Sequence, residues 1–238
     1  MAKSFHTNTH RHLIDRFKNP SGDSSGYVSD DFSFSDEEII RNWLDVRASL
    51  VSNYLDAGKK LSDQLVQTLS CVTVEEHDRS EFPSIVPSGC YWLRTVTEIP
   101  SYIKITSVTG IAANAEMPRY SPIRWDKMQY IPKDRMNHVR NGKFWTTRDS
   151  GTGRYIYLYG DRFIEQIAIS GIWENPMEAA AFPTCGVVDK DALCNPLDVR
   201  IYTDQKLLDD IVKLTWAKLL PVKQSAPEDR KNNDNPKT

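Results

Sequence analysis

The densest group of side chains that could do chemistry lies between residues 75 and 81. Carboxylates beside an imidazole are used in general acid and base catalysis, and clustered carboxylates also bind divalent cations. Consecutive residues of a strand point to alternating faces, however, so these side chains cannot all converge on one site. The pattern therefore favours a solvated turn or a charge contact between subunits. Its members are Glu75, Glu76, His77, Asp78, Arg79 and Glu81.

A second candidate is the locally basic stretch between residues 119 and 148, where aromatic residues are interleaved with Arg and Lys. Such a stretch could contact the sugar-phosphate backbone of DNA in a channel. Arg, Tyr and Trp are also enriched in protein interfaces, and we favour that interpretation. With two tyrosines just beyond the stretch, the candidate interface or channel residues are Arg119, Arg124, Lys127, Arg135, Arg140, Lys143, Arg148, Trp125, Trp145, Tyr155 and Tyr157.

The Gly151-Thr152-Gly153 sequence does not indicate a nucleotide site. It lacks the lysine-containing pattern of a phosphate-binding loop, and it leads into a strand pattern instead of the start of a helix. We therefore interpret it as a hairpin loop.

Cysteines and histidines give no metal or redox motif. Cys71, Cys90, Cys185 and Cys194 have no paired zinc-ligand spacing, so we expect reduced thiols. Three histidines, His6, His10 and His12, fall in a polar N-terminal stretch and are expected to be solvated. The sequence predicts neither a metal nor a cofactor.

Two helices should bracket the chain's central region. Ser35-Asp36-Glu37-Glu38 is a capping box, apolar residues then recur at helical spacing, and Gly58 is placed to end the helix in a left-handed conformation. A second helix is predicted over Thr203–Leu220, with Pro221 ending it. A short helical piece is also expected at Ser62–Leu69.

Between Cys71 and Arg200 the chain is rich in β-branched and aromatic residues and is interrupted by Pro and Gly. Alternation of Tyr155, Tyr157 and Tyr159 with aliphatic residues, followed by a Gly160-Asp161 turn, predicts a hairpin with the next strand. The predicted strands are Cys71–Glu76, Tyr91–Thr95, Ile103–Val108, Met128–Tyr130, Lys143–Thr147, Tyr155–Leu158 and Ile164–Ile172.

Bulk composition excludes several classes of protein. Thirty Lys and Arg against 32 Asp and Glu give a net charge of −2, which argues against dedicated DNA binding. No apolar run approaches the length of a membrane span, and the first residues lack a signal-peptide core, so we expect a protein of the cytoplasm. The polar segments 1–34 and 222–238 should be largely disordered alone, apart from one or two amphipathic turns around Leu13, Ile14 and Phe17.

These elements predict an α+β fold, in which N- and C-terminal helices form a small bundle around a central β-rich insertion of sandwich or barrel type. The predicted division has residues 1–34 as an N-terminal arm and 222–238 as a C-terminal arm. Residues 35–70 with 201–221 form the helical part, and 71–200 form the β-rich domain.

Four segments carry a resemblance to structural proteins of crAss-like bacteriophages, over roughly residues 35–220. These segments run from Ser35 to Val51, from Cys71 to Asp78, from Ile85 to Cys90 and from Gly171 to Pro176. The family members concerned resemble ring proteins of the head-to-tail connector, and more remotely the tail tubular, or adaptor, proteins of short-tailed phages.

The resemblance implies a non-catalytic virion component that forms a ring of twelve subunits on the portal protein, beside other connector or tail rings. Genomic DNA would pass through an axial channel during packaging and ejection, with only non-specific contact, and no membrane is involved. The arms would become ordered against neighbouring subunits.

Two alternatives remain open. One is a β-sandwich module for tail-fibre or glycan attachment, with Trp125, Trp145 and Trp173 as exposed stacking platforms, and the other is a small hydrolase that uses Glu75, His77 and Asp78.

Overall fold

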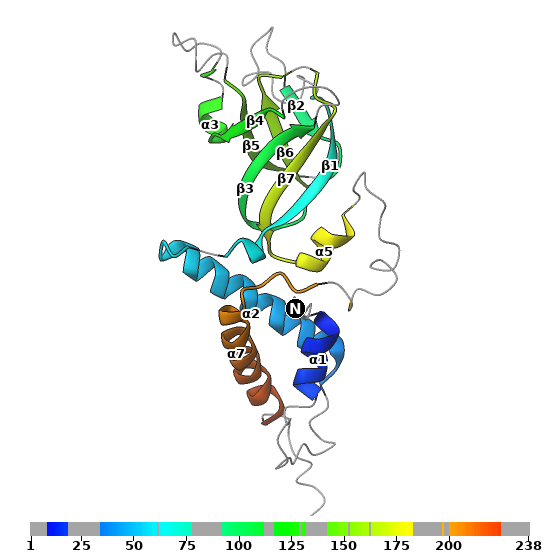
Figure 1. Cartoon of the computed structure of the whole chain (residues 1–238), viewed down its shortest axis with the longest axis vertical. Coiled ribbons are helices and arrows are strands. Elements are labelled where there is room, and N and C mark those ends of the chain that lie inside the picture. Colours follow the sequence, from blue (N-terminus) through cyan, green and yellow to red (C-terminus); the bar gives the residue numbers. More distant parts are fainter. Residues whose placement is uncertain are drawn as a thin grey trace, which may run out of the picture. The chain divides into compact units, whose positions relative to one another are not determined.

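A computed structural model describes residues 9–18, 34–60, 62–77, 92–111, 117–128, 130–131, 142–151, 153–161, 163–182, 197 and 200–224 of the chain. The chain divides into two compact units (Figure 1). The first unit combines Met1–Ser62 with Thr203–Thr238, and the second is Asp63–Tyr202.

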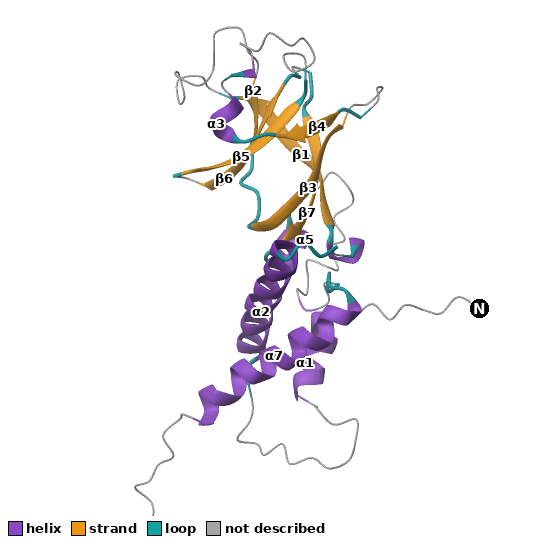
Figure 2. Cartoon of the chain, turned by 90° about the vertical axis from the view of Figure 1, so that its left-hand side faces the viewer, coloured by secondary structure: helices purple, strands orange, loops and turns teal. Residues whose placement is uncertain are grey.

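The second unit contains a closed seven-stranded barrel in the order β1-β2-β6-β5-β4-β3-β7 (Figures 1 and 2). All neighbouring strands are antiparallel except β4 and β5, which are parallel. Of the two architectures expected for the β-rich insertion, the barrel is confirmed. The strands are β1 (Gln67–Glu76), β2 (Trp92–Thr95), β3 (Tyr102–Ile111), β4 (Arg119–Pro122), β5 (Phe144–Ser150), β6 (Gly153–Tyr159) and β7 (Gln166–Trp173).

Alternate residues of each strand fill the interior of the barrel, as the period of two requires. In β7 the interior residues include Ile167, Ile169 and Trp173, all fully buried. The indole Nε1 of Trp173 donates to the carbonyl oxygen of Gln67 at 3.3 Å, so this ring both fills the core and joins β7 to the start of β1.

The predicted hairpin around Gly160-Asp161 is wrong. β6 pairs with β2 and β5, whereas β7 pairs with β1 and β3. Alternation of apolar residues identifies each strand but does not select its neighbour, and the chain crosses the barrel between the two strands. The loop around Gly151 does join a hairpin, that of β5 and β6, as predicted.

One further predicted strand needs correction, one strand was missed, and one expected helical piece is shorter than predicted. Residues near 128 form the short helix α3 (Trp125–Met128), in which the Lys127 amide donates to the Arg124 carbonyl at 3.0 Å, instead of a strand. Strand β4 was not predicted, because four residues ending in a proline carry little signal of a strand. The expected helical piece at Ser62–Leu69 is a 3-10 turn over Asp63–Leu65, after which β1 begins.

The helix α5 (Pro176–Ala181), also missed, follows β7 directly. The side chain of Asn175 caps it by accepting from the amides of Met177 and Glu178, and Pro176 occupies the first turn, where a missing amide proton costs nothing. Gln67 Nε2 donates to the Pro176 carbonyl oxygen at 3.0 Å, which fixes α5 to the start of β1.

In the first unit, helix α2 (Asp36–Asp56) packs against helix α7 (Gln205–Gln224). The capping box is confirmed, since the Glu38 amide donates to Ser35 Oγ at 3.2 Å. The predicted left-handed glycine is Gly58, with φ +67. Pro221, which was expected to end α7, lies within it, because a proline near the end of a helix removes only one hydrogen bond.

A buried arginine lies inside the first unit. Arg47 is fully buried on α2, and its Nε donates to Thr203 Oγ1 at 3.3 Å. Burial disfavours the charged guanidinium and lowers the pKa of Arg47 to about 10. At the surface of the same helix pair, Lys218 Nζ on α7 lies 2.9 Å from Asp45 Oδ2 on α2.

The expected amphipathic turns in segment 1–34 are present as helix α1 (His10–Lys18), with Leu13, Ile14 and Phe17 buried. The expectation that His10 is solvated is wrong, since its ring packs edge-on against Trp43 with centroids 5.2 Å apart.

Cys71 is disulfide-bonded, which corrects the expectation of a reduced thiol, and the other cysteines lie outside the described residues.

Candidate functional site

An aromatic cluster covers the outer face of the barrel over β6. Period-two alternation sends Ile156 and Leu158 into the barrel interior, and it sends the tyrosines of β6 to the outer face. Both faces of the strand are therefore buried. We call this outer group the aromatic cluster: Trp92, Ile131, Tyr157 and Tyr159 at its centre, with Ile123, Trp125, Phe144 and Tyr155 packed against them.

The rings of this cluster meet in inclined, edge-on arrangements. Centroid distances are 4.9 Å between Trp125 and Tyr157, 5.6 Å between Trp92 and Tyr159, and 6.2 Å between Trp92 and Trp125. Aromatic pairs prefer this geometry, and each adds about 0.5–1.5 kcal/mol beyond the area it buries. The cluster therefore holds the short helix α3 on the barrel through Trp125.

Charged groups border the aromatic cluster on its solvent side. The guanidinium of Arg148 lies over the ring of Trp125, with Cζ 4.7 Å from the ring centroid. The Arg124 side chain is 79 % exposed, and its Nε lies 3.2 Å from Asp126 Oδ1. The site thus combines a partly buried indole with two guanidinium groups, one of them highly exposed.

Beside these residues lies an open groove of about 660 Å³. It forms where β4 ends and the chain turns into α3, so both elements and the middle of β5 contribute to its walls. We call it the groove, and its lining residues are Tyr102, Pro122, Ile123, Arg124, Trp125, Asp126, Trp145, Thr146 and Thr147.

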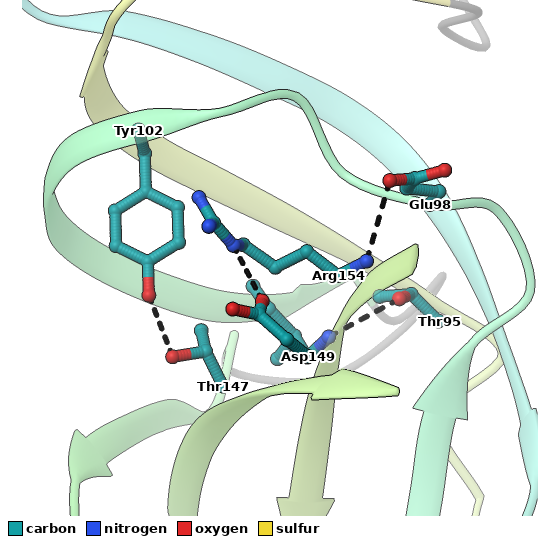
Figure 3. Close-up of polar contacts among 7 residues, drawn as sticks. Thr95, Glu98, Tyr102, Thr147, Asp149 and Arg154 are labelled. Carbon is teal, nitrogen blue, oxygen red and sulfur yellow. Dashed lines mark hydrogen bonds and ion pairs between the residues drawn. The ribbon is translucent and has the colours of Figure 1, made fainter. Parts of the chain in front are cut away.

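One end of the groove is crossed by a polar network, shown in Figure 3. The hydroxyls of Tyr102 and Thr147 are 2.6 Å apart, which joins β3 to β5. Arg154 lies beside the Tyr102 ring: its Cζ is 5.1 Å from the Tyr102 ring centroid, and its Nε donates to Asp149 Oδ1 at 2.7 Å. The Arg154 amide also donates to Glu98 Oε1 at 3.4 Å.

Hydrogen bonding within this network shifts two pKa values. The hydrogen bond from Arg154 holds the pKa of Asp149 below its ordinary value, and the same bond raises the pKa of Arg154. Elsewhere on the barrel, burial raises the pKa of Tyr120, and the nearby charge of Asp161 adds to that shift. None of these groups is brought near neutrality, where proton transfer chemistry would need it.

The structure brings together six of the residues that the sequence singled out, of which Tyr155 packs against the aromatic cluster. Trp125 contacts Tyr157 and Arg148, while Arg124 and Trp145 line the groove beside them. Trp145 and Tyr157 are buried, so they support the surface more than they form it.

The remaining candidates lie elsewhere or are engaged locally. Lys143 Nζ is 2.6 Å from Asp161 Oδ2. Tyr155, besides its contact with the cluster, lies under the Arg94 guanidinium with Cζ 5.0 Å from the ring centroid. Arg119 is exposed at the far end of β4, opposite Thr109 of β3. Lys127 is exposed on α3, and Arg135 and Arg140 lie outside the described residues.

The acidic group at the end of β1 does not form a catalytic site in the described part of the chain. Glu75 points to solvent and pairs with Arg94, with an N–O distance of 3.3 Å. His77 is buried and packs edge-on against Tyr157, with centroids 5.2 Å apart. Asp78, Arg79 and Glu81 lie outside the described residues. Residues two apart in a strand share a face, so alternation alone would put Glu75 and His77 together. They differ because β1 ends at Glu76 and His77 lies beyond it, buried while Glu75 is exposed.

Sequence reasoning missed four residues of this region, namely Tyr102, Thr147, Trp92 and Tyr159. Tyr159 could have been found, because it continues the alternation of Tyr155 and Tyr157. Tyr102 is far along the chain from Thr147, so only the barrel topology reveals that the two hydroxyls meet.

The arrangement has the chemistry of a protein contact. Among the described residues, no group of three His, Cys, Asp or Glu side chains could hold a metal ion. Trp145 and Trp173 are buried in the barrel core, so they cannot serve as exposed platforms for a glycan. The partly buried Trp125 between Arg124 and Arg148 resembles the aromatic and arginine anchors of protein interfaces.

Comparison with known proteins identifies one family. The family model described as phage tail ring protein 2, a ring protein of crAss-like phages, matches residues 23–238, which include parts of both units. A search of curated proteins finds no match. In the parts of the chain that the structure describes, no helix has the length and apolar character needed to cross a membrane.

Proposed function

This chain belongs to the phage tail ring protein 2 family of crAss-like phages, and we propose that it is the repeating subunit of a closed ring in the head-to-tail connector. The family match carries this proposal. It makes the chain a structural component of the virion, and a ring needs a heterologous interface whose rotation closes the circle.

In this proposal the ring extends the portal and encloses part of the channel through which the genome is packaged and ejected. It has twelve copies and contacts the portal protein and other connector or tail rings. The chain is made in the host cytoplasm and assembles there into the virion. With a net charge of −2, any contact with DNA is non-specific and local, which is suited to a channel through which DNA must slide.

The two units have separate roles in the proposed ring. The first unit supplies a small helical bundle from α2 and α7, which belong to the helical part 35–70 with 201–221, and from α1, which precedes that part. The β-rich part 71–200 supplies the surface around α3. The polar segments 1–34 and 222–238, apart from α1 and the last residues of α7, become ordered against neighbouring subunits, because their composition buries too little apolar surface to order alone.

We assign the contact between subunits to the rim of the groove. Arg124 is highly exposed there, Trp125 is partly buried, and Arg148 is held over the indole ring. An aromatic and arginine centre of this kind often carries most of the binding free energy of an interface. Arg119, Lys127 and Lys143 belong to the wider interface or the channel wall in this proposal, as do Arg135, Arg140 and Tyr155.

Electron microscopy of the purified protein, alone and mixed with a portal ring, tests this function. We expect closed rings alone, or rings that form only on the portal. The variant Trp125→Ala should reduce the fraction of closed rings. Trp216 on α7 is likewise partly buried, and its ring centroid lies 5.2 Å from that of Phe17, so the matched variant Trp216→Ala should affect folding stability first. A chain that stays monomeric and does not bind a portal ring would overturn the proposal.

A further inference from the structure

Strand β4 closes the barrel over only a short length. It pairs with β3 at Val108 and Thr109, and with β5 at Phe144 and Trp145. Beyond these pairs, β3 is bonded to β7 and β5 to β6, and within the described residues neither has a strand on its other side. Figure 2 shows β5 and β6 running side by side away from β3 and β7. We call this gap in backbone pairing the seam.

Backbone groups of β5 face the seam at alternate residues. The Trp145 carbonyl oxygen accepts from the Ile123 amide at 2.9 Å, so the polar backbone groups of Trp145 point toward β4. Because the direction alternates along a strand, those of Thr147 and Asp149 point the same way, where β4 no longer reaches. An exposed edge of this kind accepts an extended peptide as an added strand.

Among the described residues, side chains of Tyr102 and Thr147 cross the seam next to this edge. The Tyr102 hydroxyl lies 2.6 Å from Thr147 Oγ1, and the Arg154 guanidinium lies over the Tyr102 ring (Figure 3). The groove of about 660 Å³ opens at the same place, since Tyr102 and Thr147 are among its lining residues. A peptide that follows β5 would therefore run directly into the groove.

The charge at the groove selects an acidic occupant. Arg124, Lys127 and Arg148 lie on or beside its α3 wall, against the single carboxylate of Asp126. Three segments that flank the helices of the first unit in the sequence lie outside the described residues, and their charges differ. Segment 1–8 contains Lys3 and no acid, and segment 225–238 has equal numbers of acidic and basic residues.

The third segment, 19–33, fits the groove. It contains three aspartates and no basic residue, together with Tyr27, Val28 and Phe32, which favour a strand. We propose that the seam and groove bind residues 23–33 of a second copy of this chain as an added strand on β5, with Asp30 and Asp31 toward Arg124 and Lys127. This inference rests on the proposed ring, which places a second copy beside each subunit.

Peptide binding to the full-length protein tests the site without requiring a ring. A fluorescent peptide of residues 23–33 should bind saturably, and Arg124→Glu with Lys127→Glu should weaken it about ten- to a hundredfold. A peptide with Asp30→Lys and Asp31→Lys should bind wild type weakly and regain affinity for that variant. The control Arg41→Glu with Lys60→Glu makes the same change of charge at exposed positions of the first unit and should leave binding unchanged.

Backbone pairing is tested separately by methylating one or the other alternate set of amides in the peptide. N-methylation at every second residue should abolish binding in one register and leave it nearly unchanged in the other, because only alternate amides face β5. Hydrogen exchange at Thr147 and Asp149 should slow when the peptide binds. If both N-methylated peptides bind equally well, or if exchange at the Thr147 and Asp149 amides is unchanged, the proposal that the peptide adds a strand to β5 is wrong.

Carbodiimide crosslinking of mixed light and heavy isotopic chains identifies the source of the segment. Crosslinks from Asp30 or Asp31 to Lys127 should join light to heavy chains, whereas exclusive crosslinking within one chain would overturn the contribution of a second copy. Rings that form without peptide binding would overturn this inference alone. Peptide binding by a protein that never forms rings would overturn the proposed function while leaving the site itself intact.

Discussion

The interior of the barrel and the centre of the aromatic cluster on its outer face are both buried but differ in chemistry. Ile156 and Tyr157 are adjacent in β6, both 0 % exposed, and they point to opposite faces. The interior is mostly aliphatic, whereas the outer cluster consists largely of rings that carry N–H or O–H groups and ends at exposed Arg124. The interior therefore maintains the fold, while in the proposed ring the outer cluster supports the surface for a partner.

Trp173→Ala, in the interior, should have the largest effect on stability. The ring is fully buried and its Nε1 donates to the Gln67 carbonyl, so its loss leaves a cavity and an unpaired acceptor. Urea unfolding should show a loss of about 3–5 kcal/mol. If that variant does not fold, Trp173→Phe should lose a smaller amount, about 1–3 kcal/mol. A Trp173→Ala variant as stable as wild type would contradict the account of the interior.

Trp125→Ala, in the outer cluster, should be milder. It removes the contacts with Trp92, Tyr157 and Arg148 but leaves the barrel interior intact, so we expect a loss of about 1–2 kcal/mol by urea unfolding. The same variant should impair ring formation strongly. If this variant forms rings as wild type does, the outer cluster is not needed for the contact between subunits.

Tyr102→Phe tests the side-chain bridge across the seam. The change deletes the hydroxyl that lies 2.6 Å from Thr147 Oγ1, and we expect it to cost about 0.5–1.5 kcal/mol by urea unfolding. Tyr54→Phe is the matched control, since that hydroxyl makes no hydrogen bond within the described residues. Equal effects of the two substitutions would mean that the bridge contributes nothing.

Asp149→Asn should have the smallest effect, because the Asp149 side chain is 69 % exposed. The ion pair with Arg154 lowers the pKa of Asp149 in the folded state, so its contribution of about 0.2–1 kcal/mol is present at neutral pH. As pH falls through that lowered pKa the carboxylate is protonated and the contribution is lost. Urea midpoints of wild type and variant should therefore differ at neutral pH and converge in acid, and a difference independent of pH would contradict this.

Local signals in the sequence predicted individual elements well. Ser35 and Gly58 predicted the two ends of α2, because capping and left-handed glycine are decided by neighbouring residues alone. The alternation of Tyr155, Tyr157 and Tyr159 likewise predicted β6. These signals depend on no distant part of the chain.

Strand pairing and the site could be predicted only in part. The same alternation in β6 suggested β7 as its partner, but the two faces of β6 are buried by separate groups, and β5 and β2 flank it instead. Arg124, Trp125 and Arg148 were identified by composition. Tyr102 was not, because its role depends on β3 and β5 lying on either side of a β4 that is too short to separate them fully.

Native mass measurement of the purified protein, with and without a portal ring, tests the central claim most directly. The account predicts a closed species whose mass is an integral multiple of the 27.2 kDa chain, formed alone or on the portal. A single 27.2 kDa species at every concentration, unchanged by the portal ring, would contradict it.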